Sequence, residues 1–143
     1  MSKQETEQAI QRLVEYLQSN KVTVEFNSEG DNAYYPIPNM IRINTRQNVK
    51  SRYYSLLHEV GHYLLRQKED FSTKYLVDHS FSSKNKDMRI DVLREEIAAW
   101  DKALDFVFMN KYPYEQDKWN FYSKKFIYQY ANWVVNPAKF IDD

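Results

Sequence analysis

The chain has 143 residues, of which 43% are hydrophobic and 16% aromatic, enough for one modest core and typical of a single domain over residues 1–143. Twenty basic residues balance twenty acidic ones, so charge gives no support to a nucleic-acid or membrane partner. The absence of cysteine excludes disulfides, thiol nucleophiles and cysteine metal sites, leaving histidine and carboxylates as the strong metal ligands.

The N-terminal third of the chain predicts a helix and a small sheet. Residues 3–19 follow a capping-box sequence and carry apolar residues at helical period, which predicts an amphipathic helix. Residues 22–26 and 40–44 read as two strands, and we expect them to form a small antiparallel sheet. Residues 34–39 hold two prolines, which remove backbone donors, so we expect a loop or an edge segment there.

The remaining two thirds predict helices. Residues 48–67 lack proline and have apolar residues at spacings of four, three and four, as a buried helix does. Residues 68–87 are polar and predict a long, partly ordered loop that would be mobile without substrate and could form a lid. Helical period then runs through Leu93, Ile97, Trp100, Leu104 and Val107, and again through Trp119, Tyr122, Phe126, Tyr130 and Trp133.

This order of elements predicts a mainly helical α+β domain with the sheet beside the helix of residues 48–67. No apolar run approaches the roughly 20 residues of a membrane helix or the 7–15 of a signal-peptide core. We therefore expect a cytoplasmic protein without a membrane partner.

The helix of residues 48–67 carries the sequence HEVGH. His58 and His62 stand four residues apart, so their rings project from one helical face and can bind one metal ion. Glu59 cannot easily bind the same ion, but it can reach a water molecule on it, as a general base must. Zinc would lower the pKa of that water and polarise a carbonyl, while Glu59 passes the proton to the leaving amine. The motif predicts a zinc peptidase of the zincin type.

A pattern with three fixed positions also arises by chance, and a solvated or hydrogen-bonded histidine pair is the alternative. The apolar helix, the preceding strand and the use of two of only three histidines favour the metal. Gly61 favours it too, because glycine inside a helix costs about 0.5–1 kcal/mol relative to alanine. Its place beside His62 indicates that a neighbouring backbone comes close there.

We predict that Glu96 is the third protein ligand. At about 100° per residue, Glu96 lies at the edge of the apolar stripe of the later helix, and Glu95 falls nearly opposite. We therefore expect Glu95 to be a solvated surface carboxylate, although a shifted helix would exchange the two. Ala99 and Ala103 follow at helical spacing and would let this helix approach the histidine helix near Gly61.

Other zincin classes place the third ligand elsewhere. Metzincins need a glycine and a third histidine where this chain has Leu65 and Lys68, which excludes that class. A SprT-like arrangement would use His79, the one histidine left, as third ligand. The sequence does not choose among the candidates for stabilising an oxyanion, which are Tyr34, Tyr35, Tyr75 and His79.

Residues 40–44, 51–65 and 95–100 together resemble the ImmA/IrrE zinc-peptidase family of bacteria, phages and mobile elements. In that family an arginine before an aromatic residue, an HExGH core and a following apolar pair recur, and a glutamate before a small and an aromatic residue supplies the third ligand. Here Ala98 replaces a frequent acidic residue or asparagine, and Trp100 a frequent phenylalanine. The resemblance implies a gluzincin-like fold, zinc, and limited proteolysis of a protein partner, frequently a transcriptional repressor.

Two functions from different classes remain. The first is an endopeptidase that cleaves an extended segment of a protein or peptide substrate, and the alternative is a non-catalytic, zinc-stabilised interaction module. Glu59 favours the enzyme, because a structural zinc site uses four ligands and no base, whereas a catalytic site keeps three ligands and a water. Nucleic-acid binding would need a basic stripe, but acidic and basic residues are interspersed, and the short neutral chain leaves no room for a helix-turn-helix.

Overall fold

The computed structural model describes residues 1–75 and 85–137. Helix α1 (Lys3–Ser19) starts at Ser2, whose hydroxyl accepts from the Glu5 amide at 3.1 Å while the Glu5 carboxylate accepts from the Ser2 amide at 3.3 Å. This reciprocal pair is the predicted capping box, and it satisfies two amide groups that the first turn of a helix leaves free. One face of α1 is buried through Ala9, Leu13, Val14 and Leu17.

The sheet has three strands, β1 (Thr23–Asn27), β2 (Ala33–Tyr35) and β3 (Met40–Asn44), in the order β1-β3-β2. Both predicted strands are present to within a residue. Their expected antiparallel pairing is wrong, because β1 runs parallel to β3. The intervening chain turns back as β2 and takes the antiparallel place beside β3, which leaves β1 the opposite side. The sheet is therefore mixed, and β2 forms the edge that the two prolines predicted.

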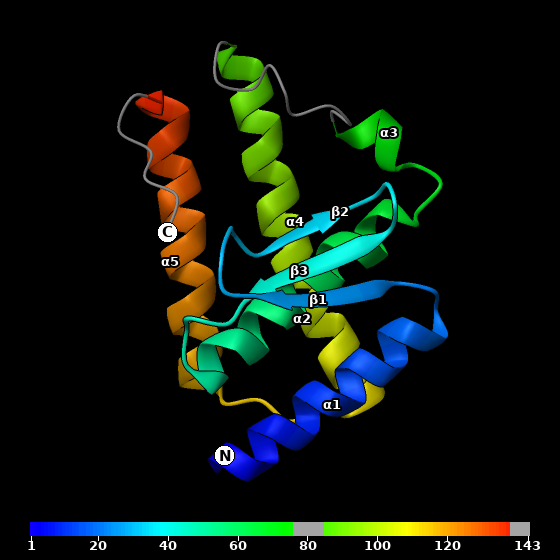
Figure 1. Ribbon diagram of the computed structural model, residues 1–143. Helices are drawn as coiled ribbons and strands as arrows, with labels where there is room; N and C mark the ends of the chain where they lie inside the picture. Colours follow the sequence, from blue (N-terminus) through cyan, green and yellow to red (C-terminus); the bar gives the residue numbers. More distant parts are fainter. Residues whose placement is uncertain (76–84, 138–143) are drawn as a thin grey trace.

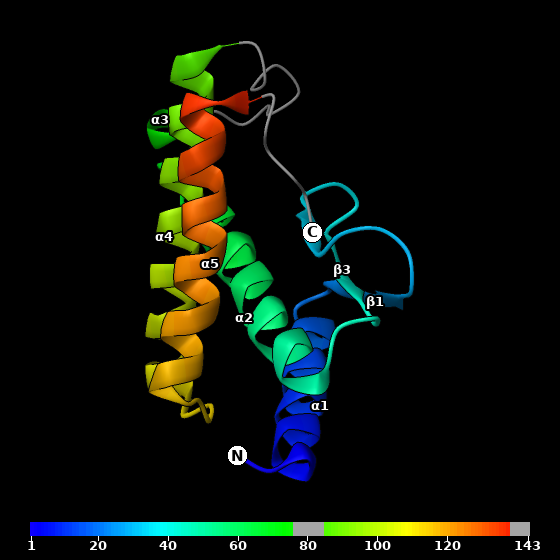
Figure 2. The ribbon, with the colours of Figure 1, turned by 90° about the vertical axis from the view of Figure 1, so that its left-hand side faces the viewer.

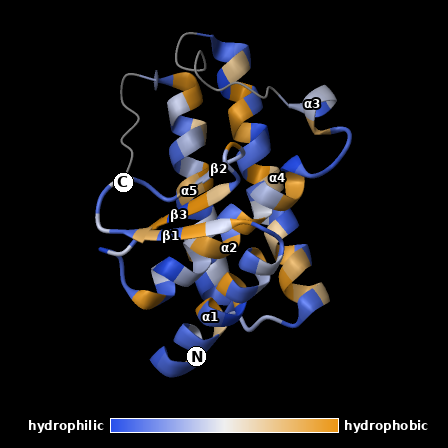
Figure 3. Ribbon diagram, turned by 45° about the vertical axis from the view of Figure 1, so that its right-hand side comes forward, coloured by the Kyte–Doolittle hydropathy of each residue, from blue (hydrophilic) through white to orange (hydrophobic). Residues whose placement is uncertain are grey.

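Helix α2 (Val49–Arg66) is the centre of the molecule and confirms the helix predicted for residues 48–67. Asn48 caps it, with its side-chain oxygen accepting from the Ser51 amide at 2.8 Å. The sheet and α1 cover one side of α2, and the long helices α4 (Lys86–Asn110) and α5 (Gln116–Val135) cover the other (Figure 1, Figure 2). The sheet and α2 both carry hydrophobic residues (Figure 3), and Ile41 and Ile43 of β3 share one buried cluster with Leu56 and Val60 of α2. This arrangement confirms a mainly helical α+β fold.

Two tyrosines of α2 form hydrogen bonds with the turn between α4 and α5. The Tyr53 hydroxyl donates to the carbonyl of Pro113 at 2.6 Å, and the Tyr54 hydroxyl accepts from the Glu115 amide at 2.9 Å. Both rings are buried, and burial raises the pKa of Tyr54 to about 12. These bonds satisfy polar groups that would otherwise be buried without partners.

Part of the loop predicted for residues 68–87 is ordered. A short helix, α3 (Phe71–Lys74), lies within the predicted loop. The last two residues of that loop, 86 and 87, already belong to α4. Residues 76–84 are outside the described part of the chain, and the prediction of a mobile lid falls mainly there. Among the helices of the described ranges, none is both long enough and apolar enough to cross a membrane.

The contact between α2 and α4 is unusually close at Gly61. A side-chain carbon at Gly61 would overlap the carbonyl oxygen of Ala99, with the Ala99 carbonyl carbon 2.8 Å away and the Ala103 methyl 3.2 Å away. Ala99 and Ala103 are fully buried. The sequence prediction that α4 approaches α2 through small residues at Gly61 is confirmed.

We expect Gly61→Ala to lower the free energy of unfolding by about 1–3 kcal/mol, as overpacking of a core does. The sign is diagnostic, because alanine normally stabilises a helix interior relative to glycine by about 0.5–1 kcal/mol. Urea unfolding of both proteins measures the difference, with Asp101→Ala at an exposed position of α4 as the control. A variant as stable as the wild type would contradict the close contact.

Candidate metal centre

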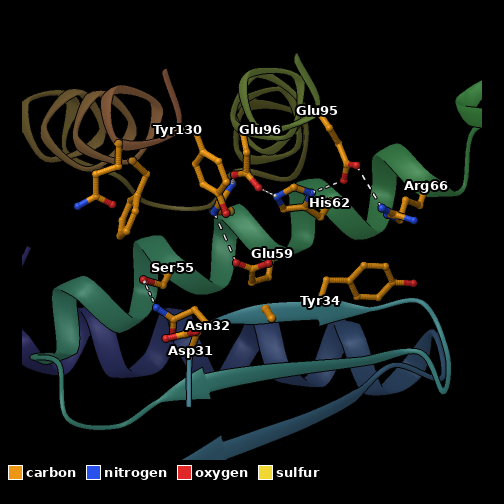
Figure 4. A pocket seen from close by; sticks show the side chains of 14 residues that line it. Asp31, Asn32, Tyr34, Ser55, Glu59, His62, Arg66, Glu95, Glu96 and Tyr130 are labelled. Carbon is orange, nitrogen blue, oxygen red and sulfur yellow. Dashed lines mark hydrogen bonds and ion pairs between the residues drawn. The ribbon is translucent and has the colours of Figure 1, made fainter. Parts of the chain in front are cut away.

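The structure brings the three predicted ligands together. His58 and His62 are buried on α2 with ring centroids 4.7 Å apart. Glu96 of α4 reaches both rings, because its Oε2 is 2.9 Å from Nε2 of His58. Its Oε1 is 3.1 Å from Nε2 of His62 (Figure 4). A tetrahedral ion with bonds of about 2.0–2.1 Å sets its ligand atoms roughly 3.3 Å apart. The two nitrogens and the carboxylate therefore have nearly the spacing of a metal-binding set.

Two of these atoms are buried without a hydrogen bond. Nε2 of His58 and Oε2 of Glu96 face each other at ion-pair distance, but neither has a hydrogen-bond partner in the described structure. Buried polar atoms in proteins nearly always have one. A cation bound between them would take a lone pair from each, so the donor set fits a metal ion.

The charges of the site also favour a cation. Glu59, Glu95 and Glu96 are all buried here, and among the described residues Arg66, largely buried, is the one basic side chain besides the histidines that lines the pocket. Four acidic side chains line the pocket, Asp31 among them, against Arg66 and the two imidazoles, so acidic groups outnumber basic ones in its described wall. Burial of unbalanced charge is costly. A divalent cation would offset the excess.

The pKa values of the ligands follow from this arrangement. Burial alone would lower the pKa of His62, but the carboxylates of Glu96 and Glu95 outweigh it and raise that pKa well above its usual value. Burial alone would raise the pKa of Glu96, but His62 and His58 hold it well below its usual range. Both directions show a site that favours positive charge beside the carboxylate of Glu96.

Glu59 lies beside this set and is 5% exposed. One of its oxygens is 3.5 Å from Nδ1 of His58, and ligand atoms of His58, Glu59 and His62 lie within 4.8 Å of one another. Glu96 is closer to the two Nε2 atoms, so it is the better third ligand. Burial raises the pKa of Glu59, although His58 and His62 partly offset this. A carboxylate with a raised pKa is better suited to accept and return a proton near neutral pH.

The two histidine rings are held in different ways. The ring of His58 stacks on Trp100, with centroids 4.3 Å apart and planes within 5°. The Nδ1 atom of His62 is 2.7 Å from Oε2 of Glu95, and the other Glu95 oxygen accepts from Arg66 at 3.1 Å. Each ring is thus fixed by a residue of α4 that is itself almost fully buried.

The prediction that Glu95 is a surface carboxylate is wrong, because its exposed fraction is 1%. The apolar stripe expected for α4 was misplaced: Ile97 is 39% exposed, and the buried face is centred instead on Ala99 and Ala103. The small residues facing Gly61 set the rotation of α4, and this rotation turns both glutamates toward α2. Polar residues that bury themselves in a site carry no apolar signal in the sequence.

The site opens into a pocket whose wall comes from four parts of the chain (Figure 4). Besides the residues above, it is lined by Asp31, Asn32, Ala33 and Tyr34 before and in β2, by Ser55 in α2, and by Phe126, Gln129 and Tyr130 in α5. The helical spacing of Phe126 and Tyr130 in the sequence predicts only core residues of a helix. Their spacing of four, which places both on one face, was the signal available for finding them.

Of the three oxyanion candidates within the described residues, Tyr34 alone lines the pocket, and its hydroxyl donates to Asn39 at 2.8 Å. Tyr35 is 37% exposed, and Tyr75 contacts Phe71 beside α3. His79, also the alternative third ligand, is outside the described residues. Tyr130 of α5, which the sequence did not suggest for this role, also lines the pocket (Figure 4).

Comparison of the chain with protein-family models, curated proteins and solved structures finds no significant match. The resemblance to the ImmA/IrrE family therefore rests on its local motifs and stays a hypothesis. The assignment of His58, His62 and Glu96 as metal ligands depends on the distances and burial described above.

We expect the purified protein to bind one zinc ion per chain, His62→Ala to abolish binding, and Glu96→Gln to weaken it at least about tenfold. An amide is a poorer ligand than a carboxylate, yet it keeps the same shape. Competition with a chromophoric chelator measures the affinities. Asp101→Asn, an exposed change on the same helix, is the matched control and should bind like the wild type. Absence of stoichiometric binding at micromolar zinc would contradict the assignment.

Proposed function

We propose that the protein is a zinc-dependent metallopeptidase that makes limited cuts in a protein or peptide substrate. The observation that carries this proposal is the buried carboxylate of Glu59, which lies beside a three-ligand set and faces an open pocket. A structural zinc site has four protein ligands and no use for such a base. A hydrolytic site needs three ligands, a base and room for substrate, and all three are supported by the geometry.

The residues would divide the work as follows. His58, His62 and Glu96 would hold zinc, which when bound polarises a substrate carbonyl and lowers the pKa of a coordinated water. Glu59 would take the proton from the attacking water onto its carboxylate and deliver it to the nitrogen of the leaving amine. Trp100 would keep the ring of His58 in place by stacking. Tyr130 would donate from its hydroxyl to the developing oxyanion.

The edge strand β2 supports an extended peptide as substrate. Residues of β2 and of the segment before it line the pocket, and in the described part of the chain β2 pairs with β3 alone. The outer edge of such a strand offers backbone donors and acceptors to a further strand. An extended peptide bound there would pass directly in front of Glu59. A repressor as the substrate, a cytoplasmic location, and the absence of nucleic-acid and membrane partners stay predictions.

The alternative is a zinc-stabilised interaction module of the same fold that turns nothing over. Exposed aromatic residues on the outer face of α5 favour it, since Phe121 and Tyr128 are 59% and 71% exposed. Aromatic side chains are common anchors of protein interfaces. The two functions differ in whether Glu59 matters for anything beyond the shape of the pocket.

We expect Glu59→Gln to keep the fold and the zinc content while lowering peptide cleavage by about 10²–10⁴-fold, because the amide cannot accept the proton. The test incubates zinc-loaded protein with a library of peptides from a digested proteome and identifies new termini by mass spectrometry. Wild type treated with a chelator is the negative control. The zinc-loaded Asp101→Asn variant is the positive control and should cleave like the wild type.

Two outcomes would overturn the proposal. Equal cleavage by Glu59→Gln would exclude the role of general base. Stoichiometric zinc without any new termini from the library or from folded proteome fractions would favour the interaction module.

A further inference from the structure

We propose that Glu95, held in place by Arg66, is a positioning residue that fixes the proton of His62 on Nδ1 and so keeps Nε2 free for the metal. This inference rests on the proposed zinc site. It assigns a role to Glu95, a buried carboxylate of the site that neither the ligand set nor the general base uses.

The two neighbouring glutamates of α4 contact opposite nitrogens of one ring (Figure 4). Glu95 Oε2 is 2.7 Å from Nδ1 of His62, and Glu96 Oε1 is 3.1 Å from Nε2. Consecutive residues of a helix project about 100° apart, so the imidazole fits between their side chains. One carboxylate is therefore a candidate ligand, and its neighbour is a hydrogen-bond acceptor on the far side of the ring.

The proton assignment follows from the donors and acceptors present. An ionised carboxylate only accepts hydrogen bonds, and a guanidinium only donates them. Glu95 Oε1 accepts from Arg66 at 3.1 Å, so Oε2 is left to accept from Nδ1–H of His62. A neutral imidazole with its proton on Nδ1 presents the lone pair of Nε2 to the pocket. This tautomer is the one that a metal ion at Glu96 requires.

Arg66 makes the position of Glu95 rigid. It stands four residues after His62, so both are on the same face of α2 and Glu95 bridges them. Its guanidinium also lies over the ring of Phe71 in α3, 4.6 Å from the centroid. With 13% of its side chain exposed, Arg66 is largely withdrawn from solvent, where such a pair holds its geometry better than at the surface. The bridge thus ties α2, α3 and α4 at the site.

The predicted effect of Glu95→Gln depends on which way the new amide turns. If its oxygen faces Arg66, its NH₂ group faces Nδ1 and drives the proton to Nε2, where it blocks the metal. If its oxygen faces Nδ1, its NH₂ group confronts the guanidinium, donor against donor. Both arrangements oppose zinc binding, and we expect the affinity to fall about 10–100-fold. Glu95→Asp keeps a carboxylate and should recover part of the loss.

The first test needs no substrate and no activity. The chain has only three histidines, so ¹⁵N-labelled wild type gives a simple imidazole spectrum, with His79→Ala to assign one residue. We expect the Nδ1 proton of His62 to be present, strongly deshielded and slow to exchange, in both the metal-free and the zinc-loaded protein. A wild-type spectrum in which Nδ1 of His62 carries no proton would overturn the proposal even if the protein binds zinc.

The second test compares zinc affinities of folded variants. The expected order is wild type and Asp101→Asn highest, then Arg66→Lys and Glu95→Asp, with Glu95→Gln lowest. A merely structural role would lower the unfolding midpoint of Glu95→Gln while leaving its zinc affinity within about twofold of wild type, and that result would also overturn the proposal. If Glu95→Gln does not fold, Arg66→Lys and Glu95→Asp decide by the same comparison. If wild type binds no zinc, the proposed function fails, and the Nδ1 proton still tests the bridge.

Discussion

The close contact between α2 and α4 at Gly61 determines where every functional group of the site can be. A side chain at Gly61 would overlap the backbone of Ala99, so the two helices come closer here than any residue larger than glycine would permit. Glutamate has a short reach, so a carboxylate on α4 meets an imidazole on α2 only when the helices are this near. The same contact fixes the rotation of α4, since Ala99 and Ala103 must both face Gly61. Glu95 and Glu96 lie one turn before Ala99 and two turns before Ala103, so they are turned toward α2 as a result.

The site gathers more charge than an apolar interior tolerates by itself. Desolvation favours neutral carboxylates, whereas the imidazoles and Arg66 favour charged ones, and the balance differs from residue to residue. For Glu96 the histidines prevail and its pKa falls, while for Glu59 burial prevails and its pKa rises. Two glutamates within one pocket are thus suited to different tasks, one to remain an anionic ligand and the other to exchange a proton. The difference comes from their neighbours, since Glu96 contacts both Nε2 atoms and Glu59 contacts neither at hydrogen-bond distance.

The sequence predicted the elements well and the histidine helix in particular, because capping residues and apolar period are local signals. It also predicted the approach at Gly61, because a glycine in a buried helix needs a reason. It failed for the parallel pairing of β1 and β3, which depends on where the intervening chain turns back, and for the burial of Glu95. The large apolar residues of α4 predict a buried face that excludes Glu95. The observed rotation of α4 is set instead by its small residues, Ala99 and Ala103, which pack against Gly61. Tyr130 was missed because an aromatic residue at helical spacing is read as core, and only the packing of α5 on α4 places it beside the site.

The contacts made by the two histidines explain how two ligands on a single helix can both be oriented toward one metal ion. Two ligands four residues apart share the rotation of α2, so neither can be aimed independently by the backbone, and their rings must be set by contacts from outside. Trp100 restrains the plane of His58 by stacking, while the two nitrogens of that ring face Glu59 and Glu96. Glu95 instead engages one nitrogen of His62 and so sets both the orientation and the chemical form of that ring. All of these contacts come from α4, five residues apart. The metal centre is therefore a property of the α2–α4 pair, and α2 alone would carry the motif without the site.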